Sequence, residues 1–337
     1  MALRLVEIMV PFDSLERIPT LLQDAPVIHV WTSGAPDTSG IVRVLLKAED
    51  TEAVSDLFFR EFGSLDSFRL ILFPVEGTIP RMTEPEPQEE TVPDPHGKTG
   101  KGLLMRISRE ELYEDLGAAG KLTPIYVIMV ILSTAVASIG LIRGDVPVII
   151  GAMVIAPFLG PNMALALSCA LGDFSLAKHA LKAIGIGAAT SMLLSCFIGF
   201  LLTIDPLTPQ ILSRTSPDIG DMVLAFAAGA AGSLAFTTGI PAVVVGVMVA
   251  VALLPPLVTS GLLLGAGHFL PALGALILLF TNITCINLAA ISTFFLQKVR
   301  PMNWWEADKA KKATRIATVI WISLLCILLV LMVIVQV

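Results

Sequence analysis

The chain has 337 residues, of which 55% are hydrophobic and 15% are charged, and its mean hydropathy is +0.82. This composition excludes an ordinary soluble domain and indicates a protein with several membrane spans. Residues 1–97 hold 7 Lys and Arg against 17 Asp and Glu, whereas residues 98–337 hold 15 against 11. An acidic soluble part would repel phosphates, so we expect no nucleic-acid partner.

Residues 1–80 show short strand and helix patterns. The strands are expected at 3–10, 27–32, 41–47 and 68–75, with helices at 12–23 and 51–61 between them. The order β-α-β-β-α-β predicts a small α+β domain with the ferredoxin-like fold, of a kind that can regulate an attached domain. The first 30 residues contain no uninterrupted signal-peptide core, so we expect this domain in the cytoplasm.

The segment 81–101 is rich in Pro and Glu and has few large apolar residues, which predicts an extended linker. Ser108 and Glu111 have the spacing of a capping box, and they indicate an amphipathic helix within residues 102–120, before the first span.

Residues 121–337 form the predicted transmembrane domain. Stretches of about 20 apolar residues predict seven spans: 122–142, 146–170, 178–202, 221–237, 240–265, 271–297 and 315–336. With the N-terminus inside, thirteen Lys and Arg fall on the cytoplasmic side, and only Arg143 and Arg214 fall outside. This bias predicts a multi-pass protein of the inner (cytoplasmic) membrane.

Two of these spans contain helix-breaking prolines in similar surroundings. Gly151–Asn162 reads GAMVIAPFLGPN, and Gly246–Leu257 reads GVMVAVALLPPL. A shift of 95 residues aligns Gly151 with Gly246 and Pro161 with Pro256. Three crossings separate equivalent points, so the copies would run in opposite directions. The pattern predicts a membrane all-α bundle with a 3+3 inverted repeat and one extra span.

In transporters of this architecture, discontinuous helices hold a polar solute near mid-membrane. The candidate substrate-binding residues are the helix breakers and their polar neighbours: Gly151, Pro157, Gly160, Pro161, Asn162, Gly246, Pro255, Pro256, Thr259, Ser260, Asn282 and Asn287. Asp173 is a candidate for a coupled proton or cation step. The alternatives are prolines that only kink packed helices, asparagines that only bond neighbouring helices, and an Asp173 that is a solvated turn residue.

Several classes of site are not expected. The sequence lacks the common metalloprotease, serine-hydrolase and phosphate-loop motifs, and the four cysteines lack metal-ligand spacing. We therefore predict no enzyme, no catalytic residue, no metal and no cofactor. Residues 225–233 are almost all small, which suits packing inside the bundle, the interpretation that we favour, or a subunit interface. The second interpretation would make the protein a homo-oligomer, and the sequence does not decide between the two.

The run Gly151–Pro161, the following Gly172-Asp173 pair and the preceding SREEL segment at 108–112 resemble the prokaryotic membrane family called domain of unknown function 389. The resemblance covers roughly residues 100–300. It implies a multi-span inner-membrane protein, often with a soluble domain attached, and it implies no substrate.

The sequence favours a membrane transporter or channel for a small polar or ionic solute, with the site at the paired breaks. The expected partners are the lipid bilayer and that solute. The alternative is a membrane-anchored sensor or scaffold whose soluble domain binds an effector or partner.

Overall fold

The computed structural model describes residues 3–35, 39–65, 67–75, 107–238, 242–299 and 304–336. The predicted linker at 81–101 lies outside the described residues. The chain divides into two compact units, Met1–Glu111 and Leu112–Val337, and each is described by itself.

The first unit contains a four-stranded antiparallel sheet. Its strands are β1 (Leu3–Pro11), β2 (His29–Ser33), β3 (Ser39–Lys47) and β4 (Arg69–Val75), in the order β2-β3-β1-β4. The first connection holds a 3-10 helix, η1 (Phe12–Arg17), and the short helix α1 (Ile18–Leu21); the second holds η2 (Ala48–Asp50) and α2 (Thr51–Phe62). The single helix expected at 12–23 is thus two short ones, with Pro19 in the first turn of α1.

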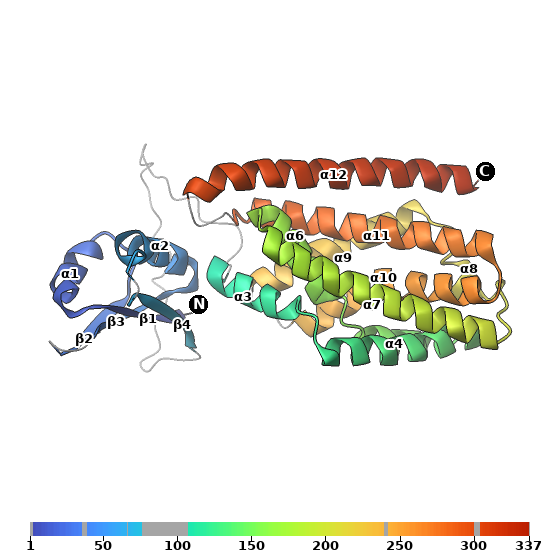
Figure 1. Ribbon diagram of the computed structural model, residues 1–337, viewed down its shortest axis with the longest axis horizontal. Coiled ribbons are helices and arrows are strands. Elements are labelled where there is room, and N and C mark those ends of the chain that lie inside the picture. The colour runs from blue at the N-terminus through green and yellow to red at the C-terminus, as the bar shows by residue number, and fades with distance from the viewer. Residues whose placement is uncertain are drawn as a thin grey trace, which may run out of the picture. The chain divides into compact units, whose positions relative to one another are not determined.

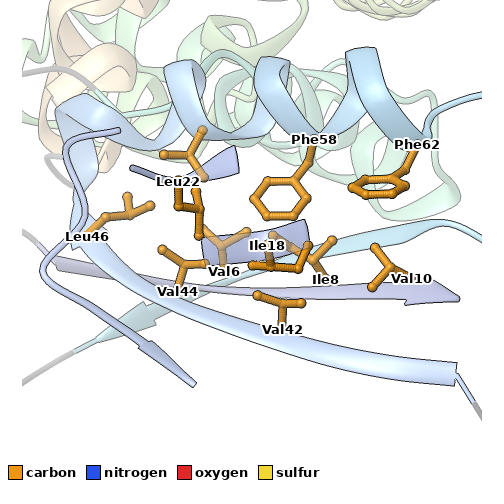
Figure 2. Close-up of a cluster of buried hydrophobic side chains, with 11 residues drawn as sticks. Val6, Ile8, Val10, Ile18, Leu22, Val42, Val44, Leu46, Phe58 and Phe62 are labelled. Carbon is orange, nitrogen blue, oxygen red and sulfur yellow. The ribbon is translucent and has the colours of Figure 1, made fainter. Parts of the chain in front are cut away.

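One face of this sheet packs against the helices. Alternate residues of β1 and β3 point towards α1 and α2, as period-2 patterning predicts (Figure 2). The buried side chains are Val6, Ile8, Val10, Ile18, Leu22, Val42, Val44, Leu46, Val54, Phe58 and Phe62. Full burial of each large apolar side chain contributes about 1.5–3 kcal/mol, so this cluster is the main stabilising element of the unit.

The helix α3 (Arg109–Ala119) begins in the first unit. Ser108 Oγ accepts the Glu111 amide at 3.2 Å, as a capping box requires. The Glu111 carboxylate, however, accepts two bonds from the Arg4 guanidinium, at 2.8 and 3.0 Å. Half of the predicted capping box is therefore replaced by a forked ion pair.

The second unit is helical (Figure 1). Its elements, beyond the last part of α3, are α4 (Pro124–Arg143), α5 (Val146–Ile155), α6 (Leu159–Leu171), α7 (Phe174–Leu201), α8 (Pro209–Leu212), α9 (Ile219–Thr238), α10 (Ala242–Gly265), α11 (Phe269–Leu296) and α12 (Trp304–Gln336). Each of the seven expected ranges coincides with one helix or, for 146–170, with the pair α5 and α6.

In the described part of the chain, five helices are long and apolar enough to cross a membrane: α4, α7, α9, α10 and α11. The bent pair α5 and α6 makes a sixth candidate, and the described apolar section of α12, Arg315–Leu331, is shorter. Large apolar side chains are exposed along α4, α7 and α9, whereas α6 and α10 are mostly buried. This distribution is that of a multi-pass membrane protein, with α6 and α10 at the centre.

Short corners make consecutive helices neighbours. Gly144 ends α4 with φ +68°, a conformation that favours glycine, and the Asp145 carboxylate caps α5 by accepting the Val148 amide at 3.3 Å. Gly172 ends α6 in the same way with φ +70°.

The closest helix contacts depend on glycine. Gly199 of α7 lies against the Leu262 carbonyl of α10, and Gly265 of α10 lies against the Cys196 carbonyl of α7. On α9, Gly229 lies against the Ile286 backbone of α11. The buried small residues of this stretch, Ala225, Ala228, Gly229, Gly232 and Ser233, therefore pack inside the bundle, as small residues at membrane-helix contacts do.

Candidate functional site

The break between α5 and α6 bends the chain by 53° at residues 156–158. Pro157 has no amide hydrogen, so it cannot donate to the Met153 carbonyl four residues earlier. Just after the break, Asn162 Nδ2 donates to the Phe158 carbonyl at 2.8 Å. The discontinuity predicted for the first motif is therefore present. The buried Asn162 side chain bonds to the backbone at the start of α6.

The second motif is not broken. Helix α10 runs without interruption from Ala242 to Gly265 with Pro255 and Pro256 inside it, so the expectation of paired broken helices is corrected to one break. The physical reason lies in α11. Pro256 removes the donor for the Ala252 carbonyl, and Asn282 Nδ2 of α11 donates to that oxygen at 2.8 Å. A neighbouring side chain thus replaces the lost helical bond.

The buried asparagines also join α6 to α11. Asn287 Nδ2 donates to Asn162 Oδ1 at 3.2 Å and to the Ile283 carbonyl at 2.9 Å. Asn162 and Asn287 are both almost completely buried. The hydrogen bonds therefore connect Asn162 to α11, and not to the candidates Thr259 and Ser260 of α10.

Thr259 and Ser260 lie further along α10 than Ala252, the residue that Asn282 contacts. Ala252 lies opposite Asn282, and Thr259 follows seven residues later, about 10 Å further along the helix at 1.5 Å per residue. Within the described residues, several buried oxygens of this core have no hydrogen-bond partner: Thr259 Oγ1, Ser260 Oγ, Thr281 Oγ1, Asn282 Oδ1 and Asn287 Oδ1. Such oxygens are costly in an apolar interior unless a ligand or water reaches them.

The three candidate glycines have different surroundings. A Cβ built at Gly160 would lie 2.5 Å from the Ala119 carbonyl oxygen, so this glycine allows α3 to approach α6. A Cβ at Gly246 would meet Leu159 at 3.5 Å, and one at Gly151 would meet nothing within 4 Å. Gly160 therefore serves packing.

Asp173 caps the first turn of α7. Its carboxylate accepts the Ser175 and Leu176 amides at 2.8 and 3.0 Å and the Tyr113 hydroxyl at 2.6 Å. Burial tends to raise the pKa of Asp173, but these hydrogen bonds outweigh it and lower the pKa. The hydrogen bond from the Tyr113 hydroxyl to Asp173 raises the pKa of Tyr113 to about 12. An ionised capping carboxylate accounts for this geometry.

We expect Asp173→Ala to lower the free energy of unfolding by about 1 kcal/mol near pH 7, because the α7 cap is lost. Because the folded pKa of Asp173 is lowered, its stabilisation is present above the unfolded pKa of about 3.9 and is lost as pH falls through the folded value. Thermal unfolding from pH 7 to pH 3 measures this. Asp173→Asn, which keeps a capping oxygen, is the control; an Ala effect that persists unchanged at pH 3 contradicts the account.

A cavity of about 420 Å³ lies along α5, the helix that precedes the break. It is lined by residues of α4, α5, α8 and α10 and by the turn after α8: Leu141, Val146, Ile149, Ile150, Met153, Pro209, Gln210, Ser213, Arg214, Val251 and Pro255. Met153 and Val251 are the residues four positions before Pro157 and Pro255, so their carbonyls have lost helical donors to proline. Sequence reasoning missed both, although the spacing from each proline could have indicated them.

These features define a helical membrane protein with one bent helix pair and an attached antiparallel-sheet unit. Residues 153–288 match the family described as Domain of unknown function (DUF389). The chain is also similar to "Uncharacterized protein MJ0678" of Methanocaldococcus jannaschii, with 35% identity over 335 residues that cover 99% of each chain. The protein belongs to this family. No solved structure matches it.

Proposed function

We propose that this protein is a transporter or channel that carries a small polar or ionic solute across the membrane. The observation that carries this proposal is the cavity lined by Met153, Val251 and Pro255. Backbone carbonyls without helical donors are tolerated at membrane depth where protein or a water-filled cavity satisfies them. Met153 and Val251 line such a cavity, where a solute can replace the missing donors.

A repeat in the helix boundaries supports this proposal. A shift of 95 residues carries the ends of α4 (124 and 143) onto those of α9 (219 and 238) and the ends of α7 (174 and 201) onto those of α11 (269 and 296). The left-handed glycines agree too, with φ +70° at Gly172 and +82° at Gly267. We infer that residues 124–201 and 219–296 are two copies of one unit, of which only the first keeps an open break.

We propose an inner-membrane location with the N-terminal domain in the cytoplasm, on the basis of the thirteen-to-two distribution of Lys and Arg. The strand order β2-β3-β1-β4 supports a ferredoxin-like fold for that domain. Its proposed role is regulatory.

Flux into proteoliposomes tests the proposal. The purified full-length chain should take up at least one solute from a panel of organic anions, organic cations, sugars and alkali ions. Val251→Trp should reduce that flux to background because the indole fills the cavity, whereas Ile128→Trp, at an exposed position of α4, should leave it unchanged. No flux of any solute under either a solute gradient or a membrane potential would favour the anchored sensor or scaffold.

A further inference from the structure

The charge that lines the cavity is positive. Among the described residues that line it, Arg214 is the charged one. Burial lowers the pKa of Arg214, and the carboxylate of Asp221 opposes this only in part. A guanidinium stays protonated under such conditions, so the cavity holds a partly desolvated positive charge.

The carboxylates of Asp145 and Asp221 accept hydrogen bonds from backbone amides outside the cavity. Asp145 caps α5 through the Val148 amide, and Asp221 Oδ2 accepts the Asp218 amide at 3.1 Å. Neither lines the cavity. An anion inside the cavity would therefore meet Arg214 without a lining carboxylate to repel it.

Gln210 supplies a second polar group on the same wall. A Cβ built at Gly144 would lie 2.9 Å from Gln210 Oε1, which is buried without a hydrogen-bond partner in the described chain. With the oxygen against the α4–α5 turn, the Nε2 amide is the donor that Gln210 can offer to a ligand. Gln210 lies in α8 and Arg214 in the turn that follows it, and both line the cavity.

The rest of the wall is mostly apolar. Leu141, Ile149 and Met153 come from α4 and α5, and Val251 and Pro255 come from α10. A fully hydrated inorganic anion would lose water there without gaining enough donors. An aliphatic chain, in contrast, would gain from contact with these side chains.

We propose that this cavity binds a small organic monoanion: a carboxylate held by Arg214 and Gln210, with a short aliphatic chain against Ile149, Met153 and Pro255. The inference rests on the proposed transport function for its physiological meaning, and it names the substrate class of that site. Guanidinium and amide donors suit the two oxygens of a carboxylate.

Protection of a cysteine tests this inference without any flux measurement. Ser213→Cys is introduced into a full-length chain in which Cys169, Cys196, Cys285 and Cys326 are replaced by alanine. The purified protein, in nanodiscs of zwitterionic lipid, is treated with a water-soluble methanethiosulfonate. We expect hexanoate to slow the modification in a saturable manner, and we expect hexanol, hexylammonium, chloride and phosphate at equal concentration to have little effect.

Arg214→Gln should raise the hexanoate concentration for half-protection at least about tenfold, because a charge-assisted hydrogen bond is lost. Arg143→Gln removes an arginine outside the cavity lining and should leave that concentration unchanged. Equal protection by hexanol, protection by phosphate, protection only after anionic lipid is added, or no loss in Arg214→Gln would each overturn the inference. Hexanoate protection without flux would overturn transport alone, and flux of another solute without hexanoate protection would overturn the anion site alone.

Discussion

Replacing Gly199 with alanine should lower the free energy of unfolding by about 1–3 kcal/mol, because the site has no room for even one added methyl group. The Cβ would collide with the Leu262 carbonyl, which is backbone and cannot rotate away. Helices α7 and α10 would have to separate along a contact where Gly261 and Gly265 also lie against α7. Thermal unfolding of the purified protein in detergent measures the loss.

Gly185→Ala is the matched control for this substitution. Gly185 lies on the same helix, and a Cβ there meets nothing within 4 Å. Alanine at a free helical position should be neutral or slightly stabilising. If Gly199→Ala and Gly185→Ala have the same effect, the close α7–α10 contact is wrong.

Asn282→Leu should cost about 1–3 kcal/mol, because the Ala252 carbonyl would be left buried without a donor. The cost should largely disappear in a Pro256→Ala background, where residue 256 regains its amide hydrogen and can donate to Ala252 within the helix. A double-mutant cycle on unfolding free energies measures this coupling.

Thr284→Val serves as the control for the cycle. The Thr284 hydroxyl donates to the Phe280 carbonyl of its own helix at 2.7 Å, so its loss should not depend on residue 256. Additive effects of Asn282→Leu and Pro256→Ala would show that the asparagine does not replace the donor removed by proline.

This pair of residues shows where sequence reasoning reached its limit. Pro157 lies in the break between α5 and α6, and the sequence predicted that break. The same reasoning predicted a second break at Pro255 and Pro256, which was wrong. The compensating Asn282 lies on α11, 30 residues after Ala252, and only the packing of α10 against α11 makes it a donor to α10.

The same limit applied to the site. The proline-containing motifs include two residues that line the cavity, Met153 and Pro255. Arg214 was assigned only to an outer loop, because the charge pattern carries no information on what that loop packs against. Local patterns were sufficient elsewhere: the strand expected at 3–10 is present as β1, and its residues Val6, Ile8 and Val10 lie in the core of the sheet unit.

The central claim is that a water-filled site lies inside the bundle where prolines have removed the donors to backbone carbonyls. Cysteine accessibility at Val251 tests it most directly, with the four native cysteines replaced by alanine. Val251→Cys in nanodiscs should react with a small, charged, membrane-impermeant thiol reagent, and Ile128→Cys on the lipid-facing side of α4 should not. Complete protection of the cysteine at position 251, with the protein folded and its helices intact by circular dichroism, would contradict the account.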